Sequence, residues 1–255
     1  MELRIPVGRD ELWTEHLAGD GVPIVFLHPG TGDSQVWDLV VAGLSGRRIV
    51  RYDVRGYGRS PAPTAEFSLL DDLVTVLEQL GLQRVVLVGC SMGGGTALSF
   101  ALTHPDRVHG LVLLCPSVRG FPVLEEPDLD AQYDELIANR DVDGLVEFGL
   151  PVWAATVTDD AVVAQLRSAA PAWFEQGMYL KPEPPVYDRL HEIHAPTTVM
   201  VGDHDRPIAT AAAGAAAARI PGCEFIWIPG ADHYPSLRNP QLVIDAISNY
   251  LAAND

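Results

Sequence analysis

Residues 85–102 read VVLVGCSMGGGTALSFAL, and this stretch decides the fold. The apolar run 85–88 is typical of a buried strand, and from residue 97 onward apolar residues recur at helical spacing. Between them, residues 89–93 have the pattern Gly-x-Ser-x-Gly. A strand that turns sharply into a helix around a serine holds that serine in a strained conformation over the edge of a sheet. The flanking glycines are needed because a Cβ at either place would collide across the turn. Ser91 is therefore a candidate nucleophile.

The composition excludes several classes of function. The chain has 255 residues, enough for one large domain or for a core with a subdomain. It has 17 Lys and Arg against 34 Asp and Glu, a net charge of −17, so phosphate backbones and anionic lipid surfaces would repel it. We expect no nucleic-acid partner and no membrane association. No run approaches the roughly 20 apolar residues of a membrane span, and the N-terminus has no apolar signal-peptide core, which together predict a cytoplasmic protein.

The potential metal ligands are scattered. Cys90, Cys115 and Cys223 are odd in number for a disulfide framework, and none is close enough to another in the sequence for metal-ligand spacing. The pair His191 and His194 lacks the third and fourth partners that a closed metal site needs. We therefore expect free thiols, no metal ion and no cofactor.

Short apolar runs bounded by Gly and Pro alternate with stretches of helical period, as in a parallel sheet covered by helices. The expected parallel strands are 22–27, 47–52, 85–90, 110–115, 197–202 and 224–228, with an antiparallel edge pair at 2–6 and 13–17. Ser68 and Asn239 are expected helix N-caps. The alternation stops between residues 119 and 191. The prediction is an α/β fold, with a mostly parallel twisted sheet flanked by helices in a core of residues 1–118 and 192–255, and with an inserted helical lid at 119–191.

A serine hydroxyl is a weak nucleophile at neutral pH, so Ser91 needs a histidine base and a carboxylate that holds this base. In the chain order serine, acid, histidine, the acid follows a late strand and the histidine follows the next one. The expected strand 197–202 leads into Asp203 and Asp205, and the strand 224–228 leads into His233. Two carboxylates and one histidine are therefore the candidates.

These motifs resemble the α/β-hydrolase family over residues 22 to 251. Gly202, Asp205 and Pro207 match the family's acid loop, and residues 230–233 match its Gly-x-x-His loop. Residues 53–60 match its Asp-x-Arg-Gly-x-Gly-x-Ser loop, which we interpret as a structural tie. The resemblance implies that Asp205 is the acid, with Asp203 as its competitor, and that His233 is the base.

The oxyanion loop departs from the family pattern. Family members have His-Gly after the third strand, whereas this chain has His28 and Pro29. The resemblance implies that Gly30, the next residue, donates one backbone N–H to the oxyanion and that Met92 donates the other. Thr31 is the alternative to Gly30. The resemblance also assigns Trp153, after the second helix of the lid, to the substrate pocket.

The resemblance, closest to bacterial enol-lactonase-like and carbon–carbon-bond hydrolases, implies a serine hydrolase that needs no cofactor. We expect it to cleave an ester or lactone of a small, largely apolar molecule through an acyl-enzyme. The same triad serves carbon–carbon-bond hydrolases, proline-releasing peptidases and cofactor-free haloperoxidases, and some proteins of this fold are receptors that bind a ligand without turnover. The partner is a small-molecule substrate, and the protein is a monomer or a homo-oligomer.

Overall fold

A single eight-stranded sheet organises the chain, whose computed structural model describes residues 1–122 and 126–254. The strand order is β1-β2-β4-β3-β5-β6-β7-β8, and only β2 runs against its neighbours. The strands are β1 (Glu2–Val7), β2 (Asp10–Leu17), β3 (Asp20–Leu27), β4 (Arg47–Tyr52), β5 (Val85–Cys90), β6 (Val108–Leu114), β7 (Thr197–Gly202) and β8 (Glu224–Ile228).

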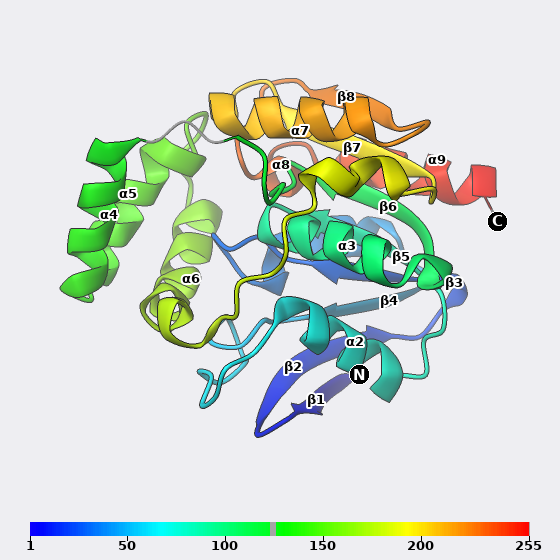
Figure 1. Ribbon diagram of the computed structural model, residues 1–255, viewed down its shortest axis with the longest axis horizontal. Helices are drawn as coiled ribbons and strands as arrows, with labels where there is room; N and C mark the ends of the chain where they lie inside the picture. Colours follow the sequence, from blue (N-terminus) through cyan, green and yellow to red (C-terminus); the bar gives the residue numbers. More distant parts are fainter. Residues whose placement is uncertain (123–125, 255) are drawn as a thin grey trace.

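Helices cover both faces of this sheet (Figure 1). On one face α2 packs against α3, and on the other α1 and α8 pack against α9. Every residue of β5 and β7 is buried, because a parallel strand between two helical layers has no solvent-facing side. This arrangement confirms the predicted fold class. The helices of the core are α1 (Asp38–Gly43), α2 (Leu69–Gln79), α3 (Met92–Thr103), α7 (Pro207–Arg219), α8 (Pro235–Arg238) and α9 (Pro240–Asn254), with short 3-10 turns η1 (Ser34–Trp37), η2 (Pro105–Arg107) and η3 (Tyr187–Glu192).

Both expected helix N-caps are present in the structure. The Ser68 hydroxyl accepts a hydrogen bond from the Asp71 N–H at the start of α2, and Asn239 Oδ1 accepts one from the Leu242 N–H at the start of α9. The strand expected at 110–115 is wrong at both ends, because β6 begins at Val108 and stops at Leu114. Cys115 has a φ of +38°, which is incompatible with a continuing strand.

Three α-helices lie between β6 and β7 among the described residues of this segment. They are α4 (Pro127–Ala138), α5 (Val142–Trp153) and α6 (Asp160–Tyr179), and Figure 1 shows them grouped at one end of the sheet. They fall within the expected lid, of which residues 123–125 lie outside the described residues, as does residue 255 of the expected core. Among the described residues, no helix is both long enough and apolar enough to cross a membrane.

Gly214, inside α7, lies where the structure has space for an added Cβ. A Cβ at Gly214 would meet no atom within 4 Å, so Gly214→Ala gains helix propensity without a clash. We expect the free energy of unfolding to rise by about 0.5–1 kcal/mol, measured by urea denaturation. Gly149→Ala in α5 is the matched control, because its Cβ would lie 2.8 Å from Leu166 Cδ2, and no gain is expected there. Equal gains in both variants would contradict the prediction.

Candidate active site

The turn between β5 and α3 holds Ser91 in a strained backbone conformation, with φ 48° and ψ −111°. A Cβ on Gly93 would lie 2.3 Å from the Leu27 carbonyl oxygen, and one on Gly89 would lie 2.6 Å from the Gly93 carbonyl oxygen. Real Cβ atoms do not approach backbone atoms so closely, so both positions require glycine. The tight turn projects Ser91 beyond the carboxyl edge of the sheet, where ligands of parallel α/β sheets bind.

His233 and Asp205 meet at the same edge, after β8 and β7 respectively. His233 Nδ1 lies 2.8 Å and 3.0 Å from the two carboxylate oxygens of Asp205, and the Asp205 side chain has no exposed surface. Asp203, the competing acid, instead accepts a hydrogen bond from the Gly230 N–H at 2.7 Å. The structure therefore brings Asp205, and not Asp203, to the histidine.

The electrostatic surroundings favour a charged His233. Burial alone lowers the pKa of His233, but the charge of the Asp205 carboxylate and its hydrogen bond to the ring favour the imidazolium, and the pKa lies well above its ordinary value. Burial also raises the pKa of the neighbouring Cys115 thiol well above its usual range. Cys115 is therefore a neutral thiol beside the histidine, and the Asp205 carboxylate is the group that stabilises the imidazolium.

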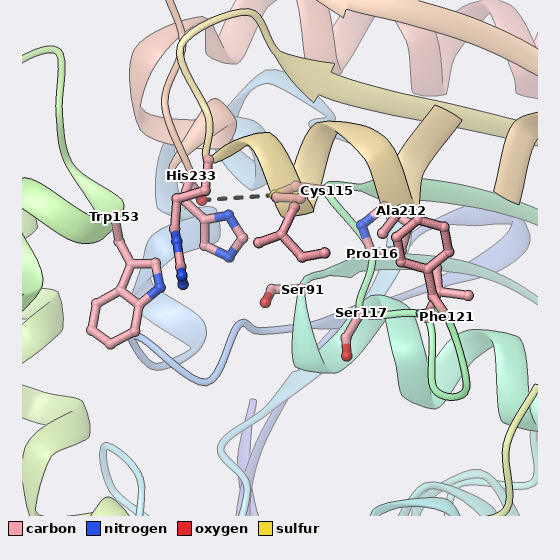
Figure 2. A pocket seen from close by; sticks show the side chains of 12 residues that line it. Ser91, Cys115, Pro116, Ser117, Phe121, Trp153, Ala212 and His233 are labelled. Atoms are coloured by element: carbon pink, nitrogen blue, oxygen red, sulfur yellow. Dashed lines mark hydrogen bonds between the residues drawn. The ribbon is translucent and has the colours of Figure 1, made fainter. Parts of the chain in front are cut away.

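Two cavities of about 250 and 330 Å³ meet at Ser91, and the side chains of Trp153 and His233 line both of them. Figure 2 shows the first cavity, with Ser91, His233 and Trp153 at its wall. The structure thus brings the predicted serine, base and pocket tryptophan together. The first cavity is otherwise lined by Cys115, Pro116, Ser117, Val118, Phe121, Arg206, Ile208, Ala209 and Ala212, and the second by Gly30, Thr31, Tyr57, Leu69, Met92, Arg119, Tyr133, Trp173, Gln176 and Leu180.

The two residues assigned to the oxyanion site lie side by side in the second cavity. A Cβ on Gly30 would lie 3.7 Å from Met92 Cβ. Met92 begins α3, so its N–H is one of the donors that a helix leaves unpaired at its N-terminus. Thr31, the alternative to Gly30, lines the same cavity, and its carbonyl accepts a hydrogen bond from the Tyr234 hydroxyl at 2.9 Å.

Helix α6 holds the oxyanion loop from the side of the insertion. The Trp173 indole N–H donates to the Gly30 carbonyl oxygen at 2.6 Å. Three residues further on, the Asp33 N–H donates to Gln165 Oε1 at 3.0 Å, and the Ser168 hydroxyl donates to the Asp33 carboxylate at 2.6 Å. The geometry of the Gly30–Thr31 peptide therefore depends on a helix that lies more than 130 residues away in the sequence.

The insertion also contacts the histidine loop. The His233 N–H donates to the Trp153 carbonyl oxygen at 3.1 Å. The adjacent Asp232 carboxylate accepts hydrogen bonds from the Thr156 hydroxyl at 2.6 Å and from Arg238 Nε at 3.0 Å. The end of α5 and the segment after it thus hold the backbone at Asp232 and His233 in place.

One group of potential metal ligands exists among the described residues. Cys115, Asp205 and His233 each have a ligand atom within 4.8 Å of the others. Asp205 and His233 already bond to each other, and the raised pKa of Cys115 disfavours the thiolate that a metal requires. Asp205 and His233 therefore form a hydrogen-bonded acid–base pair, which does not suit a metal centre with Cys115. All three cysteines are free thiols, and Cys90 and Cys115 are buried, as expected.

Trp173, Gln165 and Tyr57 take part in the site but were not predicted to do so. The two α6 residues lie in a helix with no distinctive motif. Tyr57 lies in the loop that was interpreted as a structural tie, although its side chain lines the second cavity.

The Trp173 contact can be tested with Trp173→Phe, which replaces the indole by a smaller aromatic ring and removes the donor to Gly30. We expect the rate at which a fluorophosphonate modifies Ser91 to fall by about three- to tenfold, because one hydrogen bond contributes about 0.5–1.5 kcal/mol. Trp227→Phe is the control, since Trp227 on β8 is 50% exposed and far from the loop in sequence. A lower melting temperature with an unchanged rate would show that Trp173 only supports the fold.

Comparison with known proteins agrees with this geometry. The chain matches the Alpha/beta hydrolase family model over residues 24–246. It is 28% identical over 250 residues to a putative 2-succinyl-6-hydroxy-2,4-cyclohexadiene-1-carboxylate synthase from Bacillus subtilis (strain 168), with 90% of each chain covered. It is 28% identical over 253 residues to a pimeloyl-(acyl-carrier protein) methyl ester esterase from Aeromonas hydrophila subsp. hydrophila, covering 91% of this chain and 96% of the esterase.

Among solved structures, the enol-lactonase from Burkholderia xenovorans LB400 superimposes with a TM-score of 0.82 at 22% identity, covering 98% of this chain and 100% of the lactonase. This likeness concerns the fold. The family match extends from β3 into α9 and includes the Ser91 turn and both loops that follow β7 and β8. The resemblance inferred from the sequence motifs is confirmed, and the chain belongs to the α/β-hydrolase family.

Proposed function

We propose that this protein is a serine hydrolase that cleaves an ester or lactone of a small molecule through an acyl-enzyme. The observation that carries the proposal is the meeting of the strained Ser91 with the His233–Asp205 pair at one pair of cavities. A carbonyl compound has two limbs, one on each side of the reacting carbon. Two cavities that both reach Ser91 suit such a substrate.

In the first half-reaction, Ser91 Oγ attacks the carbonyl carbon while His233 Nε2 takes the hydroxyl proton. The carbonyl oxygen becomes an anion that accepts hydrogen bonds from the N–H groups of Met92 and Gly30. Collapse of this intermediate breaks the bond to the leaving oxygen, which receives the proton from His233. Asp205 holds the imidazole with Nδ1–H toward its carboxylate, so that Nε2 faces the serine.

In the second half-reaction, His233 removes a proton from a water molecule that attacks the acyl carbon. The intermediate collapses, the proton returns to Ser91 Oγ, and the carboxylic acid leaves. The apolar side chains of the first cavity, among them Phe121 and Ile208, favour a substrate with at least one apolar limb. The full-length likeness to a methyl ester esterase supports an ester substrate. Another full-length relative is named a putative synthase, so ester hydrolysis is the activity to measure for this chain.

Labelling with a fluorophosphonate probe tests the nucleophile. We expect a single adduct, located on Ser91 by peptide mass spectrometry, and sustained hydrolysis of short p-nitrophenyl esters by the unlabelled protein. Ser91→Ala should lose the adduct and almost all of the hydrolysis, because the activated hydroxyl is removed. Ser117→Ala is the matched control, since Ser117 lines the same cavity. An adduct elsewhere, or binding of esters without turnover, would overturn the proposal.

The pH dependence of kcat/KM tests the base. His233 accepts a proton only when it is neutral, so the rate should rise with pH and reach half its maximum above pH 6.5, because the pKa of His233 is raised. Asp205→Asn removes the negative charge that favours the imidazolium. This variant should be much slower, and its inflection should move to lower pH.

Asp203→Asn, which changes the competing carboxylate, should keep the wild-type inflection. A wild-type inflection at or below pH 6.5, or one that Asp203→Asn moves and Asp205→Asn does not, would contradict the assignment.

A further inference from the structure

The hydroxyl of Tyr57 is a buried polar group whose proton has no acceptor among the described residues. The Tyr57 side chain has no exposed surface, and the donor side chains of Trp173 and Gln176 approach its oxygen without completing a hydrogen bond of good geometry. Its ring packs against His28, with 5.0 Å between the ring centroids. A buried hydroxyl without a hydrogen bond is costly to a protein, so such a group at a binding cavity calls for a ligand that completes it.

Tyr57 is one of the residues that line the second cavity, together with Gly30 and Met92. The position that a Cβ on Gly30 would occupy is 3.7 Å from the Tyr57 oxygen and 3.6 Å from Met92 Sδ. The Thr31 hydroxyl is a second buried oxygen without a hydrogen-bond partner, and it belongs to a residue lining the same cavity. Two unsatisfied hydroxyls therefore belong to one cavity at Ser91.

The charges around this cavity are already compensated. Arg119 Nη1 lies 2.6 Å from the Glu183 carboxylate, whose side chain is 3% exposed, and His233 is paired with Asp205. Burial raises the pKa of Tyr57 above its usual range, so the hydroxyl stays protonated and can donate. A neutral hydrogen-bond acceptor suits these surroundings, whereas a carboxylate would meet no cation that lacks a counter-charge among the described residues lining this cavity.

We propose that the second cavity binds a second, uncharged carbonyl oxygen of the substrate, which accepts a hydrogen bond from the Tyr57 hydroxyl. This inference deepens the hydrolase function proposed above and rests on it. The substrate then has an apolar limb toward Phe121 and Ile208 and a limb that carries a ketone, ester or amide carbonyl toward Tyr57. Tyr57 is a specificity-determining residue, because a site that loses a hydrogen-bond partner discriminates against the analogue that lacks it.

The test uses two pairs of esters that differ only in a carbonyl oxygen replaced by a methyl group. Methyl 4-oxopentanoate and methyl 4-methylpentanoate differ in the acyl limb, and 3-oxobutyl acetate and 3-methylbutyl acetate differ in the alcohol limb. We expect the wild-type protein to prefer the oxo ester in one pair, by about tenfold or more in kcat/KM. Monomethyl glutarate supplies the charged comparison and should be hydrolysed more slowly than methyl 4-oxopentanoate.

Tyr57→Phe should reduce the preference for the oxo ester to about one, and its melting temperature should stay the same or rise, because an unpaired buried hydroxyl is removed. Tyr52→Phe is the matched control, since Tyr52 is a buried tyrosine that lines neither cavity at Ser91 and should keep the wild-type preference. The inference is overturned if neither pair shows a preference, if Tyr57→Phe slows both members of each pair equally, if it destabilises the fold, or if the glutarate ester is the better substrate.

Failure of this inference and failure of the proposed function have different signatures. If the hydrolase function is wrong, none of the four esters is turned over and no probe adduct forms on Ser91. If only the inference is wrong, the esters are turned over and the adduct forms, but the oxo esters have no advantage that depends on Tyr57.

Discussion

The contact between Gly93 and the carbonyl group of Leu27 is the constraint on which the site depends. It lets the start of α3 lie against the end of β3, with no space for a side chain between them. The nucleophile turn and the oxyanion loop, which leave two different strands, therefore meet. The same contact brings Met92 next to Gly30, so two N–H donors from distant parts of the sequence can converge on one oxygen.

Most of the fold could be predicted because its signals are local. The buried strands are short apolar runs, and the N-cap residues mark where helices begin. The Gly-x-Ser-x-Gly pattern is typical of a sharp turn between a strand and a helix. Chain order and strand ends narrowed the predicted acid to Asp203 or Asp205 and indicated His233, and the structure brings Asp205 to His233. The end of β6 was missed, since nothing in the residues around Cys115 indicates its left-handed conformation.

The contacts that could not be predicted all join segments far apart in the sequence. Nothing in the spacing of Trp173 or Gln165 indicates that they bond to the loop after β3, because a helical pattern specifies which face is buried and not what covers it. The surroundings of the Tyr57 hydroxyl could not be predicted from the sequence for the same reason. The insertion thus does more than cover the cavities, since α6 supports the oxyanion loop and the end of α5 supports the histidine loop.

The order of these parts along the chain has a consequence for the newly made protein. Ser91 leaves the ribosome before the insertion, whereas Asp205 and His233 follow 114 and 142 residues later, at 205 − 91 and 233 − 91. β5 and β6 can pair early, but a serine without its base is hardly nucleophilic. Under the proposed mechanism, the nascent chain therefore carries an inert Ser91 until β8 joins β7, and the hydrolytic activity that we propose would be among the last properties that folding confers.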